Sequence, residues 1–168
     1  MSDDRLAALE LRVARLERQL QGPSSAEPPP PAAEDDVFWA LEGLLARADD
    51  PGAVLLTGHA TLPDGRVARW QESAGVAELL GTDWSQYVAV LAALAHPVRI
   101  RLLARVLSGV STVHDLMEVD GTGTSGQVYH HLRQLVAAGW LRPAGNGRFE
   151  VPVARIVPLL TTLLGARP

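Results

Sequence analysis

The strongest constraint on the fold comes from the C-terminal half of the chain, where a helical apolar pattern is followed by a hairpin signal. In the segment 124–138, Val128, Leu132 and Leu135 recur at spacings of 4 and 3, which places them on one face of a helix. A few residues later, Asn146-Gly147 is a dipeptide typical of tight β-turns. This half of the chain is therefore expected to join an amphipathic helix to a β-hairpin.

The same reasoning predicts the elements on either side. Apolar spacing and turn residues predict helices over 84–95, 96–107, 112–119 and 152–166, strands over 140–142 and 148–151, and a turn over 120–123. The order of helix, short helix, turn, helix and hairpin is that of a winged helix-turn-helix, whose second motif helix enters the major groove of DNA. We expect 83–168 to be a DNA-binding and dimerisation domain.

Several polar side chains on the predicted helix 124–138 face away from the core. They are Ser125, Gln127, Tyr129, His130 and Arg133, and Thr124 is the predicted N-cap. A Gln side chain can form two hydrogen bonds with adenine, and an Arg side chain can do the same with guanine. Ser or Tyr can hydrogen-bond to phosphate or to a base edge. Arg148, beside the predicted turn, is the expected contact of the hairpin with phosphate or the minor groove. An ordinary amphipathic helix facing water would show the same periodicity.

Two stretches resemble ArsR-type transcriptional repressors. LAALAHPVRIRLL at 91–103 is similar to the opening signature of that family. VYHHLRQL at 128–135, followed by AGWL at 138–141, resembles its recognition helix and the entry to its wing. The resemblance implies a homodimer on a near-palindromic operator, with terminal helices at the interface. The predicted helices 84–95 and 152–166 fit that role.

The chain departs from the metal sites that the resemblance would imply. Many members of the family bind metal through Cys on the helix before the reading helix, or through Asp and His on the last helix. This chain has no Cys, and no His, Asp or Glu follows Glu150. The five His residues show no ligand spacing. We expect no metal and no cofactor. No paired catalytic carboxylates and no G-x-S-x-G motif occur either, so no enzyme is expected.

Charge is distributed unevenly along the chain. The net charge is -4, but residues 1–87 carry 7 Arg against 15 acidic residues, whereas 88–168 carry 8 Arg against 4. A basic half on an acidic chain is expected where only that half meets phosphate, although chance clustering of exposed Arg gives the same pattern. Arg99 and Arg101 are assigned either to phosphate contacts or to surface ion pairs.

The N-terminal part is predicted to contain a helix and a linker. In 1–21, apolar residues form a heptad stripe: Leu6, Leu9, Val13, Leu16 and Leu20. The stripe favours a short coiled coil between subunits, and the alternative is a helix packed on its own chain. Residues 22–36 include four consecutive prolines, which indicates a disordered Pro-rich linker.

Between linker and C-terminal half, 37–82 reads as a small helix-hairpin-helix subdomain. A helix over 37–48 and a short helix over 76–80 flank strands 53–61 and 66–71, which are joined by the turn Leu62-Pro63-Asp64-Gly65. A two-stranded hairpin is marginal alone, so it must pack on other elements. We expect this subdomain to extend the dimer interface or to hold a small organic effector.

The expected fold class is therefore mainly α with small β. No apolar run reaches the roughly 18 residues of a membrane span, and the acidic start is unlike a secretory signal, so a cytoplasmic protein is expected. The expected function is a sequence-specific DNA-binding regulator, a dimeric repressor. Its partners are double-stranded DNA, a second copy or a higher homo-oligomer, and a small-molecule or protein effector. The alternative is a protein-protein adaptor built on a winged-helix scaffold.

Overall fold

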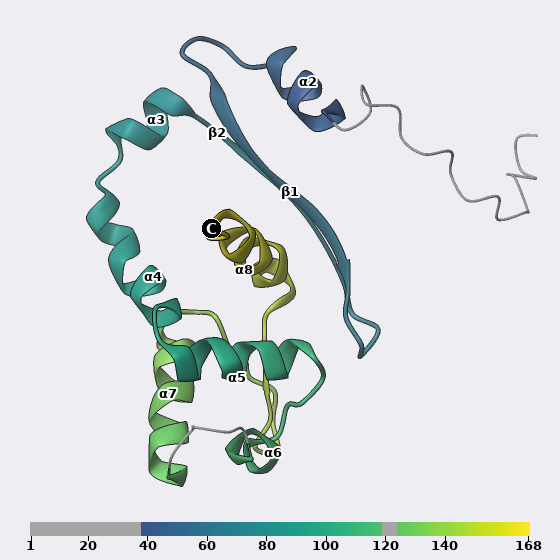
Figure 1. Cartoon of the computed structure of the whole chain (residues 1–168), viewed down its shortest axis with the longest axis vertical. Coiled ribbons are helices and arrows are strands. Elements are labelled where there is room, and N and C mark those ends of the chain that lie inside the picture. Colours follow the sequence, from purple (N-terminus) through teal and green to yellow (C-terminus); the bar gives the residue numbers. More distant parts are fainter. Residues whose placement is uncertain (1–37, 119–123) are drawn as a thin grey trace, which may run out of the picture. The chain divides into compact units, whose positions relative to one another are not determined.

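The computed structural model describes residues 38–118 and 124–168 (Figure 1). The chain divides into two units, 1–42 and 43–168; the first residues of α2 belong to the first unit, and all later elements belong to the second. The predicted coiled coil at 1–21, the predicted linker at 22–36 and the predicted turn at 120–123 lie outside the described residues.

The described part of the chain is mixed α/β, rich in helix, with two small antiparallel sheets. Its elements are α2 (Trp39–Leu45), β1 (Ala53–Thr61), β2 (Val67–Gly75), α3 (Val76–Gly81), the 3-10 helix η2 (Trp84–Tyr87), α4 (Val88–Leu94), α5 (Pro97–Leu107), α6 (Val113–Met117), α7 (Ser125–Ala137), β3 (Arg142–Pro143), β4 (Phe149–Glu150) and α8 (Val153–Gly165). β1 pairs with β2, and β3 pairs with β4.

The β1–β2 hairpin agrees with the prediction at its turn and in β1. Gly65 has a φ of 82°, which glycine adopts at little cost, and its N–H donates to the carbonyl of Leu62 at 2.9 Å. Strand β2 is longer than expected and reaches Gly75, which pairs with Ala53. Ser, Ala and Gly near its end are weak strand formers, so the longer strand results from backbone pairing with β1 rather than from propensity.

One face of this hairpin packs against α8 (Figure 1). Ala68 is fully buried, and Leu56 and Trp70 are partly buried against the core. At Gly58 the approach is so close that an added Cβ would lie 2.7 Å from Cγ1 of Val157. The hairpin is therefore part of the same core as the C-terminal helices.

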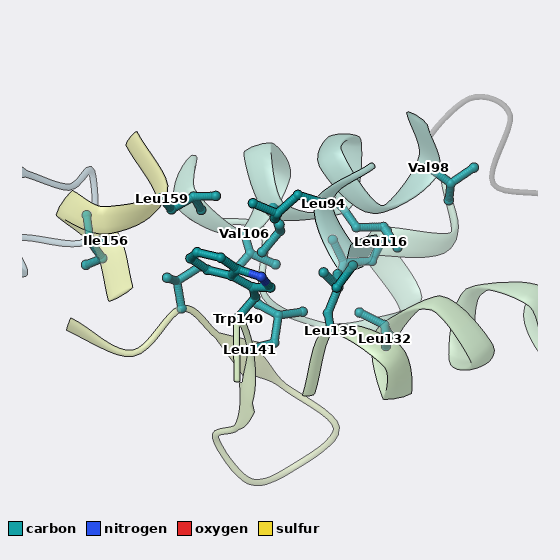
Figure 2. Close-up of a cluster of buried hydrophobic side chains, with 14 of the residues drawn as sticks. Leu94, Val98, Val106, Leu116, Leu132, Leu135, Trp140, Leu141, Ile156 and Leu159 are labelled. Carbon is teal, nitrogen blue, oxygen red and sulfur yellow. The ribbon is translucent and has the colours of Figure 1, made fainter. Parts of the chain in front are cut away.

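The rest of the core joins α5, α6, α7 and α8 (Figure 2). Its largest fully buried side chains are Leu102, Leu103, Leu116, Leu132, Leu135, Leu141, Ile156, Leu159, Val128 and Val151. Trp140 is 3% exposed, and its Nε1 donates to the carbonyl of Val90 at 2.9 Å. Trp140 thereby ties the end of α7 to α4.

Several other predicted elements also differ in their bounds: the helix expected over 37–48 is only Trp39–Leu45, and the strand expected over 148–151 is only Phe149–Glu150. The helix expected over 84–95 is divided into η2 and α4, and Asp83 caps η2 by accepting the N–H of Ser85 at 2.9 Å. The strand expected over 140–142 begins only at Arg142. The N–H groups of Trp140 and Leu141 instead donate to the carbonyl of Leu135, at 2.9 and 3.2 Å. These two bonds satisfy a carbonyl in the last turn of α7, which a helix otherwise leaves unpaired.

Within the described residues, no single helix is long and apolar enough to cross a membrane. The segments Trp84–Leu94 and Pro97–Leu107 reach the required length and hydropathy only together, and they meet at a bend of 76°.

Candidate nucleic-acid interface

Helix α7 begins with a capping arrangement that uses one of the predicted reading side chains. Thr124 is the N-cap, with extended backbone, and its N–H donates to Oε1 of Gln127 at 2.8 Å. This is the reciprocal half of a capping box, which satisfies a backbone donor at the helix start. The amide oxygen of Gln127 is therefore engaged, and its amide NH₂ remains as a donor.

The two faces of α7 differ sharply in burial. Val128, Leu132 and Leu135 are 0% exposed, as their spacing predicted. The residues assigned to DNA binding are exposed: Thr124, Ser125, Gln127, Tyr129, His130 and Arg133. Helix α7 packs on α5 and α6 (Figure 1). Its apolar face is buried, and among the described residues its polar face is left exposed.

Arg99, for which the sequence allowed two roles, is used inside the protein. Its Nε donates to the carbonyl of Ala93 at 2.6 Å, and one terminal nitrogen donates to the carbonyl of Ala92 at 2.8 Å. The other bonds the amide oxygen of Gln134 on α7. Arg99 thus satisfies the last carbonyls of α4 and links α4 to α7, so a phosphate contact is not its role here. A helix that ends just before His96-Pro97 leaves its last carbonyls without backbone donors. The position of His96-Pro97 in the sequence was therefore the signal that a nearby side chain would donate to them.

Two imidazole rings, tilted by 39° to one another, are in contact where α5 meets α7. The rings of His96 and His131 are 4.6 Å apart between centroids, and Nδ1 of His131 is buried without a hydrogen-bond partner among the described residues. Nδ1 of His96 caps α5 by accepting the N–H of Val98 at 3.2 Å. Burial lowers the pKa of His131, and the nearby His96 and Arg99 lower it further. Sequence periodicity did not predict this pair, because the two rings come from different helices.

The β3–β4 hairpin follows α7 and contacts the segment before α6. Gly145, Asn146 and Gly147 all have positive φ values, which the predicted turn dipeptide requires. The N–H of Phe149 donates to the carbonyl of Ser111 at 2.8 Å, and Thr112 forms a bridge with Arg148. The hairpin is therefore fixed to the protein at its second strand.

The two arginines of this hairpin have different environments. Nε of Arg142 donates to the Glu150 carboxylate at 2.6 Å, so its charge is largely neutralised. Arg148 is exposed, and within 38–118 and 124–168 its guanidinium has no ion pair. Arg148 is thus free to meet an anion.

Charge along this part of the chain has one sign. From Thr124 to Phe149 the sequence contains Arg133, Arg142 and Arg148 but no Asp or Glu. The exposed face of α7 and the tip of the β3–β4 hairpin therefore present donors and positive charge.

In the described ranges, no group of three or more His, Cys, Asp or Glu side chains could hold a metal ion.

Comparisons with protein-family models, with curated proteins and with solved structures found no match for this chain. An exposed helix with donor side chains, followed by a hairpin with an unpaired arginine, is chemically suited to a polyanion.

Proposed function

We propose that the chain is a sequence-specific DNA-binding regulator, and that 83–168 form a winged helix-turn-helix. In this proposal α7 is the recognition helix and the β3–β4 hairpin is the wing. The observation that carries the proposal is the acid-free stretch from Thr124 to Phe149, which combines an exposed helix face with an exposed hairpin tip. The resemblance of 91–103 and 128–141 to ArsR-type repressors supports the same function.

The roles of individual side chains follow from their environments. Arg133 is exposed and has no ion pair among the described residues, so it is the best candidate to read a guanine. Gln127 can offer its NH₂ to a base edge while its oxygen keeps the cap. Ser125, Tyr129 and His130 are all exposed on α7 and would contact phosphate or neighbouring bases. Arg148 would meet phosphate or the minor groove from the wing.

A second copy of the chain is the proposed partner of the exposed apolar surface. This surface comprises large side chains on η2, α4 and α8: Trp84, Tyr87, Val88, Leu91, Leu160, Leu163 and Leu164. Exposed large apolar side chains gathered on consecutive turns of a helix, as on η2 and α4 and again on α8, are typical of interaction surfaces. Two copies joined through these helices would present two α7 helices to successive major grooves, and occupation of the operator would repress transcription.

The adaptor function is the alternative, and one experiment separates the two. Purified full-length protein is incubated with a pool of genomic duplex fragments, and the bound fragments are sequenced. The regulator proposal predicts enrichment of a near-palindromic site. Arg133→Ala should weaken that site by about 1–3 kcal/mol and relax one base position, whereas Arg148→Ala should weaken all sequences alike. The matched control is Arg167→Ala, which removes an exposed arginine outside α7 and the wing.

Recovery of fragments without sequence enrichment, or retention of full specificity by Arg133→Ala, would contradict the proposal. An adaptor would recover no DNA at all.

A further inference from the structure

The tip of the β1–β2 hairpin is joined to the β3–β4 hairpin by a single arginine. The Arg66 guanidinium donates to the carbonyl of Val151 at 2.9 Å and lies 3.5 Å from the Glu150 carboxylate. Its Nε also pairs with Asp64 at 2.7 Å, within the turn of its own hairpin. Two hairpins that are far apart in sequence therefore meet at a defined junction.

A cavity of about 310 Å³ lies at this junction. Val106, at the end of α5, and Phe149, on β4, supply its apolar lining. Ser111 and Arg148 supply polar groups, and no hydrogen bond of either side chain is formed within the described ranges. Its size is at the lower end of small-molecule sites. The volume of the cavity corresponds to about ten water molecules, which is enough for a molecule the size of benzoate.

The charges around the cavity favour an anion. Asp64 and Glu150 are both paired with Arg66, and Glu150 also accepts from Arg142. The guanidinium of Arg148 is the one lining cation without an ion pair in the described part of the chain. Guanidinium groups bind carboxylates in a bidentate geometry, and the phenyl ring of Phe149 lies in the same cavity to receive an apolar body.

We propose that this cavity binds a small monocarboxylate with a short aromatic or aliphatic body, held by Arg148 at its carboxylate end. The binding site itself does not depend on any DNA function. Its regulatory consequence rests on the proposed function: Arg148 is the proposed wing contact, so a bound carboxylate competes with phosphate for the same guanidinium.

Benzoate is the probe, added to the full-length protein and followed by amide NMR shifts and calorimetry. Saturable shifts are expected at Ser111, Arg148 and Phe149. Benzamide, which has the same shape without the charge, should bind at least about tenfold more weakly, and Arg148→Gln should lose a similar factor. The matched control is Arg69→Gln, which removes an exposed arginine from β2 away from the cavity and should bind benzoate like the parent protein.

Equal binding of benzamide and benzoate would overturn the inference, as would the absence of saturable shifts at millimolar benzoate. Because benzamide binding is measured on the unchanged protein, this outcome stands even if Arg148→Gln alters the loop.

A second measurement adds benzoate to the protein bound to its selected duplex, where release of DNA is expected. If benzoate binds but the protein ignores DNA, the regulator proposal fails and the carboxylate site stands. If DNA binds specifically and benzoate does not bind, only the carboxylate site is refuted.

Discussion

Replacing Gly58 with Ala should weaken the packing of the β1–β2 hairpin on α8. The new Cβ would lie 2.7 Å from Cγ1 and 3.4 Å from Cγ2 of Val157. Carbon atoms in contact prefer about 3.5–4.0 Å, so either the strand or the helix must move. Overpacking of this kind costs about 1–3 kcal/mol. Reduced freedom of the unfolded chain offsets about 0.4–1 kcal/mol of this cost, so the net loss is up to about 2.6 kcal/mol.

Urea denaturation of the full-length protein measures this loss as a lower midpoint at an unchanged slope. The matched control is Gly75→Ala at the end of the same hairpin. Gly75 has a φ of -66°, and a Cβ there would meet nothing within 4 Å. This variant should be about as stable as the parent protein, because the reduced freedom of the unfolded chain offsets the weaker N-cap that Ala provides for α3.

The double variant Gly58→Ala, Val157→Ala tests the cause directly. Because the smaller side chain removes the clash, the two changes should be less damaging together than the sum of their separate effects, by about 1 kcal/mol. Strict additivity would refute the close packing of strand and helix. So would a Gly58→Ala variant more stable than the parent protein.

Three further predictions concern stability. Leu132→Ala, in the fully buried face of α7, should cost about 2–5 kcal/mol by urea denaturation, and a loss below about 1 kcal/mol would mean that this face is not in the core. Thr112→Ala should cost about 0.5–2 kcal/mol, because the Thr112 hydroxyl accepts the N–H of Asp115 at the start of α6; no change in midpoint would argue against the cap. Burial lowers the pKa of His131 below 6.5, so the unfolded chain binds more protons than the folded protein as pH falls through 6.5. The free energy of unfolding should therefore keep its full value above that pH and decrease below it. His131→Gln should reduce this decrease, whereas the substitution of the exposed His114 by Gln should not.

Local patterns were enough to predict several elements. The bounds of β1, and the buried face of α7 formed by Val128, Leu132 and Leu135, follow from alternation and from helical spacing, which depend only on nearby residues. The turn at Asn146-Gly147 follows from the backbone conformation that this dipeptide favours.

Features that depend on distant residues were not predictable in the same way. The role of Arg99 depends on carbonyls at the end of another helix. The junction made by Arg66 joins residues 84 and 85 positions apart. Spacing along the chain carries no information about such pairings, because they arise only when the elements pack.

Salt dependence of binding to the selected duplex is the most direct test of the claim that α7 and the wing meet DNA. The logarithm of the binding constant should fall linearly with the logarithm of salt concentration, by about 0.9 for each phosphate that the protein neutralises. Arg148→Ala should reduce that slope by about 1, because one guanidinium no longer neutralises a phosphate, and Arg167→Ala should leave the slope unchanged. Binding that is absent even in dilute salt, or a slope that Arg148→Ala does not alter, would contradict the claim.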